Sequence, residues 1–365
     1  MAKLGEVCLL KAGKFVSAND ISPEYNNGLY PCFGGNGIRG YVADYTHDGE
    51  FPLIGRQGAL CGNVNLASGK FHATEHAVVV QPKIEMNVHW LYYALNAMNL
   101  GQYATGAAQP GLAVSKLETL SIEIPNISEQ NKIAQTLYKV EQLVNFRKQQ
   151  LAKLDELVKA RFVEMFGTFP ANPFRWSIGK IQDVVSDVRY GSSRPAVEGG
   201  KYPYLRMNNI TYSGELDLRD TKRIDIPDSE LDKCTVRRGD VLFNRTNSKE
   251  LVGKTCVYNR DELMVLAGFV IRVRINERIR PEVLSAFLNM DFSKRMLIGM
   301  CKTAIGQANI NAKELQNIDL YIPPIELQDQ FVTLKNKIDQ QKQTVQQSLE
   351  KLELLKKALM QEYFG

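Results

Sequence analysis

Apolar residues recur at alternating steps of four and three from Ile127 to Gly167, and only Arg147 and Arg161 interrupt the pattern with polar side chains. The pattern holds for about five heptads, which predicts a long helix that packs along a second helix. The apolar positions expected to face that partner helix are Ile133, Leu137, Val140, Val144, Leu151, Leu154 and Val158.

The end of the chain repeats this stretch. Gln109–Gly167 aligns with Gln307–Gly365 without a gap, a shift of 198 positions. The phrase Ile-Pro-x-Ile-x-x-Gln occurs in both copies, at 124–130 and at 322–328. A repeat of this length is too long for one unit of a solenoid, so it indicates the duplication of a whole domain with its helix. The second helix should present Phe331, Ile338, Val345, Leu349, Leu352 and Leu359 to the first.

The rest of the chain forms two similar segments. Glycine- and asparagine-rich turns alternate with short apolar runs in the first segment, which predicts mostly β structure, with one helix near 88–98. The second segment repeats landmarks of the first, since Tyr202-Pro203 matches Tyr30-Pro31. We therefore expect an α+β chain with mixed-β domains at 1–125 and 176–325, long helices at 126–167 and 326–365, and a linker at 168–175.

The composition is that of an ordinary globular protein, with 365 residues, of which 44% are hydrophobic and 23% charged. Its apolar runs are shorter than the ~18–20 residues that a membrane span needs, and the first residues lack the apolar core of a signal peptide. The six cysteines are scattered, with no Cys-x-x-Cys pair. Because this usage is typical of free thiols in a reducing compartment, we expect a cytoplasmic protein without a membrane partner.

Charge is distributed unevenly along the chain. Residues 168–325 hold 24 Lys or Arg against 19 Asp or Glu, whereas residues 1–125 hold 8 against 10. Clustered basic charge is the usual footprint of a nucleic-acid binder. The excess of basic residues in the second domain agrees with such a role, whereas the first domain has no excess of basic residues.

Two short motifs are weak indications of chemistry. Gly35-x-Gly37-x-x-Gly40 fits a dinucleotide fingerprint, but the residues after it predict a turn and a strand rather than the helix that a cofactor site needs. His72 and His76 fall in a strand pattern that places them on one face, too far apart to share a metal ion, so packed histidines are expected. We expect no catalytic residue, metal ion or cofactor in this chain.

Polar side chains on glycine-rich loops are a stronger signal. Arg matches the edge of guanine, and Asn or Gln that of adenine, because each offers two correctly spaced hydrogen-bonding groups. A single such residue is more often a solvated surface residue, so the prediction rests on the group. The candidates for base contacts are Asn36, Arg39, Arg56, Gln57, Asn63, Asn65, Arg194, Arg206, Asn208, Asn209, Arg245, Asn247 and Lys249. The candidates for phosphate contacts are Lys70, Lys201 and Lys254.

Over essentially its whole length the chain resembles the specificity (S) subunits of type I restriction–modification systems. The resemblance is carried by the doubled Ile-Pro-x-Ile-x-x-Gln phrase, by Gly239–Arg245 with Leu251–Lys254, and by Gly306–Ile310 before the second helix. It implies that Gln307 and its counterpart Gln109 also contact DNA. The first copy lacks the asparagine of the second, so no asparagine role carries over there.

The resemblance implies that the long helices form an antiparallel coiled coil and hold two target recognition domains apart with pseudo-twofold symmetry. A helix of ~38 residues spans ~57 Å, which exceeds one DNA turn of ~34–36 Å. Each domain would bind one half of a bipartite, asymmetric site in double-stranded DNA, and the helices would set the spacer. The implied partners are two modification subunits, which bring S-adenosylmethionine for adenine methylation. Restriction subunits are compatible with the resemblance but are not required by it.

Two alternatives stay open at this point. A methyltransferase or nuclease would carry an Asn-Pro-Pro-Tyr/Phe or an Asp…Glu-x-Lys set, and the sequence has neither. A coiled-coil scaffold for protein partners, without sequence-specific DNA binding, agrees with the acidic balance of the first domain.

Overall fold

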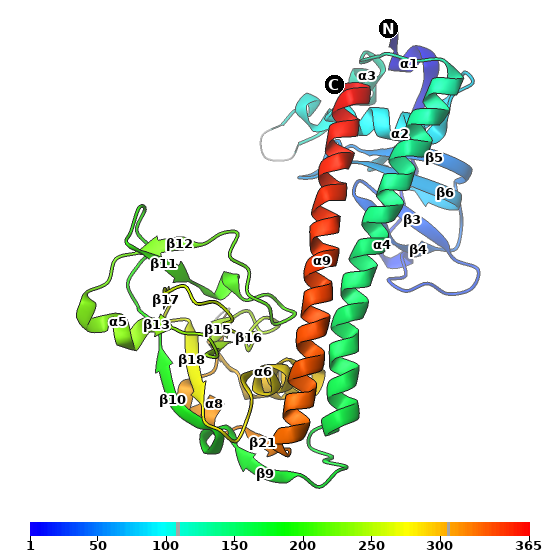
Figure 1. Cartoon of the computed structure of the whole chain (residues 1–365). Helices are drawn as coiled ribbons and strands as arrows, with labels where there is room; N and C mark the ends of the chain where they lie inside the picture. The colour runs from blue at the N-terminus through cyan, green and yellow to red at the C-terminus, as the bar shows by residue number, and fades with distance from the viewer. Residues whose placement is uncertain (107–109, 305–306) are drawn as a thin grey trace. The chain divides into compact units, whose positions relative to one another are not determined.

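The structure is a computed structural model that describes residues 1–106, 110–304 and 307–365, with side chains outside 302–307 (Figure 1). The chain divides into unit 1, which is Met1–Lys148 with Gln347–Gly365, and unit 2, which is Gln149–Gln346. Each unit holds one β-rich domain and a part of each long helix. None of the helices in the described ranges is long and apolar enough to cross a membrane.

The two long helices are α4 (Ile127–Phe166) and α9 (Ile325–Phe364), with 40 residues each. Prolines precede both, and the Asn126 side chain caps α4 by accepting a hydrogen bond from the Glu129 N–H at 3.0 Å. Directly after α4, Gly167 has a φ of 82°. This left-handed conformation is a common way to end a helix, because glycine has no Cβ to clash.

Within each unit the two helices run antiparallel, which confirms the expected pairing. In unit 1, Lys356 donates to Glu141 at 2.7 Å, and Lys148 lies 3.1 Å from Glu353. In unit 2, Lys342 forms an ion pair with Asp155. Residues further along α4 therefore contact residues earlier in α9, as in an antiparallel pair.

The expected seam positions are all at least half-buried. The buried ones are Ile133, Leu137, Val140, Val144, Phe331, Ile338, Val345 and Leu349, and the half-buried ones are Leu151, Leu154, Val158, Leu352 and Leu359. Lys342, which is also buried, was missed: it takes the position that Val144 has in the first copy. Burial alone would lower the pKa of Lys342, but hydrogen bonds to Asp155 and Glu215 outweigh burial and raise it.

Unit 1 contains a six-stranded sheet in the order β2-β7-β5-β6-β3-β4, in which only β3 and β6 pair in parallel. The strands are β2 (Cys8–Ala12), β3 (Tyr30–Gly34), β4 (Gly37–Val42), β5 (His47–Gly55), β6 (Val64–Ala73) and β7 (Ala77–Pro82). Helix α2 (Val88–Ala97) shares a core with this sheet and with the first turns of α4. The smaller elements are β1 (Ala2–Lys3), α1 (Leu4–Val7), α3 (Val114–Glu118), β8 (Ser121–Ile122) and the 3-10 turns Ala18–Asp20 and Leu100–Tyr103.

Unit 2 distributes its strands over smaller sheets. One sheet has the order β10 (Val185–Tyr190), β18 (Val270–Ile275), β14 (Val241–Asn244) and β16 (Thr255–Val257). A second has β12 (Lys222–Ile224), β11 (Tyr202–Leu205), β17 (Met264–Leu266) and β13 (Thr235–Val236). The remaining strands are β9 (Ser177–Lys180) with β21 (Asp319–Ile322), and β15 (Thr246–Asn247) with β20 (Gln307–Asn309) and β19 (Lys302–Ala304). The helices are α5 (Asp228–Cys234), α6 (Pro281–Asn289), α7 (Asp291–Met300) and α8 (Ala312–Gln316), with 3-10 turns Ile181–Val184 and Met207–Asn209.

The two units repeat one backbone frame. The order β2-β7-β5-β6 in unit 1 corresponds to β10-β18-β14-β16 in unit 2, and β3 and β11 each form a parallel pair. In both units a glycine lies where the backbone passes close to another strand. A Cβ on Gly13 would lie 2.0 Å from the Ala73 carbonyl oxygen, and a Cβ on Gly191 would lie 2.1 Å from the Leu266 carbonyl oxygen. The duplication therefore extends through the β-rich domains.

A buried glutamine ties each β-rich domain to a long helix. Gln130 accepts from the Asn87 N–H at the start of α2 at 2.9 Å, and it donates to the Pro125 carbonyl at 2.9 Å. Gln328 accepts from the Arg280 N–H at the start of α6 at 2.8 Å, and it donates to the Pro323 carbonyl at 2.9 Å. This gives the repeated Ile-Pro-x-Ile-x-x-Gln phrase a structural role.

The glycine motif, His72 and His76 of the first domain lie in or next to its sheet. The glycine motif at 35–40 lies in the hairpin of β3 and β4 and is not followed by a helix, as expected. His72 is buried on β6, with Nε2 at 3.2 Å from the Lys14 carbonyl. The strand expected to carry His76 is wrong, because β6 ends at Ala73 and His76 lies in the turn before β7, 3.1 Å from Glu75.

Candidate nucleic-acid interface

Equivalent arginines follow the central strands of the two units: Arg56 follows β5, and Arg245 follows β14. In both, the backbone N–H donates at 3.0 Å and the carbonyl accepts at 2.9 Å. The partners are His76 and Leu112 for Arg56, and Phe269 and Ile310 for Arg245. Each arginine side chain therefore projects from a backbone that is held on both sides.

Both arginines also have a buried Nε that finds no hydrogen-bond partner among the described residues. Buried N–H groups in folded proteins are nearly always paired, so each unpaired one calls for an explanation. The planar guanidinium is well suited to bidentate contact with guanine or with a phosphate. Arg206 and Arg272 also have a buried Nε that is unpaired in the described part of the chain, so what distinguishes Arg56 and Arg245 is their equivalent backbone position.

In unit 1 further polar atoms on β6 and in the turn after it are unpaired within the described ranges. They are Nδ1 of His72, Oγ1 of Thr74, Oε2 of Glu75 and Nδ1 of His76, all buried and without a hydrogen-bond partner among the described residues. Arg56 is joined to this turn by its backbone hydrogen bond to His76. The group contains donors and acceptors together, which is what the edges of bases require.

The glycine-rich turn between β3 and β4 lies next to His76 and Gln57. A Cβ on Gly35 would lie 3.3 Å from the His76 carbonyl oxygen and 3.6 Å from that of Gln57. The Asn63 side chain donates to the Asn36 side chain at 2.9 Å. The Asn65 side chain is the nearest neighbour of a Cβ built on Gly37. The structure thus brings together five of the predicted residues, which are Asn36, Arg56, Gln57, Asn63 and Asn65.

The other candidates of the first domain lie at the edge of this group or away from it. The Arg39 side chain folds over Gly34, where a Cβ would lie 2.5 Å from its Cδ. Lys70 is exposed further along β6, with Nζ at 4.8 Å from the centre of the Tyr45 ring. Gln109 lies outside the described residues.

In unit 2, Arg245 lies against Tyr190, with Cζ at 4.8 Å from the ring centre. This cation–π contact orients the guanidinium. The chain then continues into β15, which pairs with β20, so Asn247 lies beside the backbone that carries Gln307. Lys249 follows in an exposed turn. The structure therefore places these predicted residues at the end of β14.

Three predicted residues of unit 2 already have partners on the surface. Arg194 binds Glu230 at 2.7 Å, and Arg206 binds Asp220 at 3.0 Å. The Lys201 Nζ lies 4.9 Å from the ring centre of Tyr202. Ion pairs at exposed positions contribute little to stability, so these cations can exchange a carboxylate for a phosphate at small cost. Asn208 is exposed in the segment after β11.

The structure corrects two of the predicted contacts. Asn209 is 2% exposed, accepts from the Arg206 N–H at 2.8 Å and donates to the Asp217 carbonyl at 2.8 Å. Lys254 is buried, which lowers its pKa, and its Nζ donates to the Met207 carbonyl at 3.1 Å. Because both side chains hold the segment after β11 in place, neither is available to a base or a phosphate.

Sequence reasoning missed Thr74, Glu75 and Tyr190, and it interpreted His76 only as a packed histidine. His76 lies next to Arg56, and Tyr190 next to Arg245, only because their strands belong to the same sheet, which the local pattern does not show. In the described part of the chain, no three His, Cys, Asp or Glu side chains form a group able to hold a metal ion.

Comparison with known proteins decides the family. The model of the type I restriction modification DNA specificity domain matches residues 1–156 and 175–354. The chain belongs to this specificity-domain family. The two matched segments correspond to the two copies of the repeat, each with its β-rich domain and most of its long helix.

Named relatives agree with this assignment. The EcoprrI specificity subunit of Escherichia coli is 54% identical over 143 residues, which are 39% of this chain and 36% of that protein. The EcoKI specificity subunit of E. coli K12 is 22% identical over 260 residues, 67% of this chain and 56% of that protein. The chain thus spans between about a third and just over half of these relatives. The crystal structure of an S subunit from M. genitalium has the same fold, with a TM-score of 0.63 at 17% identity over 100% of this chain and 95% of that one.

Proposed function

We propose that this chain is the DNA-specificity subunit of a type I restriction–modification system. Each β-rich domain binds one half of a bipartite, asymmetric site, and the long helices set the spacer. The observation that carries the proposal is the pair Arg56 and Arg245, which share one backbone frame and one unpaired buried Nε but have different neighbours. One frame with two sets of neighbouring side chains suits a site with two different halves.

The difference in net charge between the two domains supports different roles in DNA binding. The second domain holds 24 basic and 19 acidic residues in 168–325, and the first holds 8 and 10 in 1–125. Phosphate contacts supply most of the affinity for DNA and make it depend on salt. We therefore assign most of the phosphate binding to unit 2, while unit 1 relies more on the polar group around Arg56.

The long helices are the proposed docking surface for two modification subunits. Apolar side chains stand exposed on them in unit 1, namely Tyr138, Leu143, Phe146, Leu354 and Leu355. Exposed apolar groups on a helix are typical of an interface with another protein. We assign S-adenosylmethionine and the catalytic residues to the modification subunits and no catalysis to this chain. Restriction subunits would add to the same complex.

The test is co-expression with an adenine modification subunit, followed by genome-wide mapping of methylated adenine. We expect a split motif with a fixed spacer. Exchange of residues 1–105 for the corresponding domain of another family member should change one half of the motif and leave the spacer and the other half unchanged. Exchange of the second domain is the matched control, and it should change only the other half.

The alternative function is a coiled-coil scaffold for protein partners, which the acidic balance of the first domain favours. It predicts a stable complex with the modification subunit but no methylation at any fixed motif. It also predicts no salt-dependent binding of duplex DNA. Such a result would overturn the specificity proposal.

A further inference from the structure

The repeat allows α2 and α6 to be compared residue by residue. Gln130 and Gln328 hold the starts of these helices in the same way, at Asn87 and Arg280. Counting forward from these starts pairs Tyr92 of α2 with Ser285 of α6, and Tyr93 with Ala286. Unit 1 therefore has two phenol rings where unit 2 has a hydroxymethyl and a methyl group.

In unit 1 the tyrosines fill the space between α2 and the long helices. Tyr93 is buried and donates its hydroxyl to Glu141 at 2.9 Å, while Lys356 donates to the other oxygen of this carboxylate at 2.7 Å. The Tyr92 ring meets the Tyr93 ring edge-on, with 5.0 Å between ring centres. Glu141 is therefore the polar end of a space that aromatic rings occupy.

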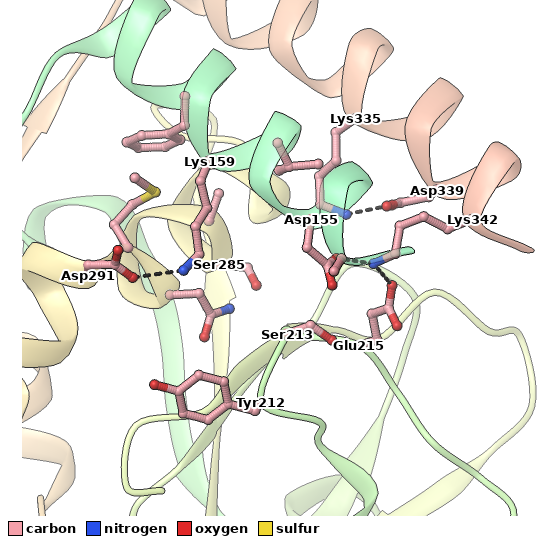
Figure 2. Close-up of a pocket in the computed structure, with 17 residues that line it drawn as sticks. Asp155, Lys159, Tyr212, Ser213, Glu215, Ser285, Asp291, Lys335, Asp339 and Lys342 are labelled. Atoms are coloured by element: carbon pink, nitrogen blue, oxygen red, sulfur yellow. Dashed lines mark hydrogen bonds and ion pairs between the residues drawn. The ribbon is translucent and has the colours of Figure 1, made fainter. Parts of the chain in front are cut away.

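In unit 2 the equivalent space is a cavity of about 260 Å³ (Figure 2). Its apolar walls are Ala152, Val158, Phe162, Ala286 and Met290. Asp339 lines the cavity at the position that corresponds to Glu141 in the repeat, and Lys335 donates to its Oδ2 at 2.5 Å. The other oxygen, Oδ1, accepts no hydrogen bond from the described residues. Unit 2 thus has a carboxylate at the same end of the space as unit 1, but no aromatic ring among the described residues takes the place of Tyr92 and Tyr93.

Three lysines and four carboxylates line the cavity, and each lysine is paired with at least one carboxylate. Lys159 binds Asp291 at 2.7 Å, and Lys342 binds both Asp155 and Glu215. Figure 2 shows these pairs around the cavity, with Tyr212 on the side opposite the long helices. Because each lining lysine has a carboxylate partner, an anionic ligand would have to break an ion pair to bind, whereas a neutral donor can bind Oδ1 of Asp339 without breaking one.

We propose that this cavity binds a small neutral aromatic compound that carries a hydroxyl or N–H donor. The ring takes the place that Tyr93 fills in unit 1, against Val158 and Phe162, and the donor binds Asp339. The volume is sufficient, since an apolar cavity of about 150 Å³ in another protein accommodates benzene. The ligand touches α4, α6, α9 and the turn at 211–215, so binding joins the second β-rich domain to the long helices.

The experiment uses p-cresol, the side-chain analogue of tyrosine, with the full-length chain and isothermal titration calorimetry. We expect saturable binding at one site per chain and at least tenfold weaker binding of toluene, which lacks the donor. Ala286→Tyr places the missing ring in the cavity and should reduce p-cresol affinity at least tenfold. Tyr93→Ala opens the equivalent space in unit 1 and should raise the stoichiometry from one to two.

Crystals of the unaltered chain soaked with 4-bromophenol keep the test independent of the folding of the variants. Anomalous density between Phe162 and Asp339 supports the proposal. Absence of density there at saturating 4-bromophenol overturns it. So does equal binding of p-cresol to the unaltered chain and to a folded Ala286→Tyr variant.

Discussion

The space between the β-rich domain and the long helices differs between the two units. Unit 1 places Tyr92 and Tyr93 there, around the single carboxylate of Glu141. Unit 2 instead has a cavity there, and the buried Lys342 lines it between Asp155 and Glu215. The backbone contacts that position the domains are the same in both, as the matching bonds of Gln130 and Gln328 show.

Some parts of this duplicated domain are the same in both copies, and others are free to differ. Hydrogen bonds between the backbone and a side chain of the long helix fix the position of α2 and α6, and they are repeated. Interior side chains next to those bonds differ, since rings fill the space in unit 1 and paired charges line a cavity in unit 2. The polar side chains near Arg56 and Arg245 differ as well, as expected if the two domains recognise different DNA sequences.

The largest expected effect is on the shared glutamines. Gln328→Ala leaves the Arg280 N–H and the carbonyls of Pro323 and Arg278 without their buried partner. We expect it to lower the free energy of unfolding by about 3–4 kcal/mol. Gln130→Ala removes two such bonds rather than three and should cost about 2–3 kcal/mol. Urea denaturation measures both, and losses no larger than that of the exposed control Gln135→Ala would contradict the equivalence.

The next effect concerns the buried lysine of unit 2. Lys342→Val installs the residue of the first copy but leaves Asp155 and Glu215 without their cation. Because both carboxylates are partly exposed, we expect a loss of about 2 kcal/mol rather than the larger cost of a fully buried pair. The triple variant with Asp155→Ala and Glu215→Ala should recover most of it in thermal unfolding. A triple variant as unstable as the single one would show that packing, not charge, explains the loss.

A pH effect should distinguish the units. Burial, with smaller contributions from Lys159 and Lys254, lowers the pKa of Lys294 to about 7. The folded chain then binds fewer protons than the unfolded chain above that pH, so stability rises as pH rises from about 7 toward the unfolded pKa of about 10.4. We expect a contribution of about 2 kcal/mol between pH 7.5 and 9.

Lys294→Met should remove this rise, which denaturation at several pH values measures. Lys249→Met, at an exposed position, is the matched control and should keep it. A rise of the same size in Lys294→Met would assign the pH dependence to other groups.

The smallest expected effects concern DNA. Arg56→Ala should weaken binding roughly tenfold, about 1.4 kcal/mol, and relax only one half of the motif. Arg245→Ala should do the same for the other half. Lys70→Ala should weaken all sequences alike, by less than Arg56→Ala, and reduce the salt dependence. Fluorescence anisotropy at several salt concentrations measures these effects. Relaxation of both halves by one arginine variant would contradict the assignment of one half to each domain.

The sequence by itself determined the features that depend on periodicity and repetition. The heptad pattern located α4 and α9 and their buried faces, because side chains three and four residues apart share a helix face. The gapless repeat showed that the domain was duplicated, and Tyr30-Pro31 and Tyr202-Pro203 do begin equivalent strands. The glycine motif at 35–40 was interpreted as a turn and a strand because no helix pattern follows it.

Only the tertiary structure decided which polar residues meet. His76 lies beside Arg56 because β7 pairs with β5, and that pairing joins residues about twenty positions apart. Asn209 and Lys254 have the residue types of DNA contacts, yet their neighbours bury them. The cavity beside Ala286 is invisible in either repeat alone, because a space becomes apparent only when the side chain that fills its counterpart, Tyr93, is known. Local sequence fixes the elements, whereas contacts between distant residues decide what each side chain faces.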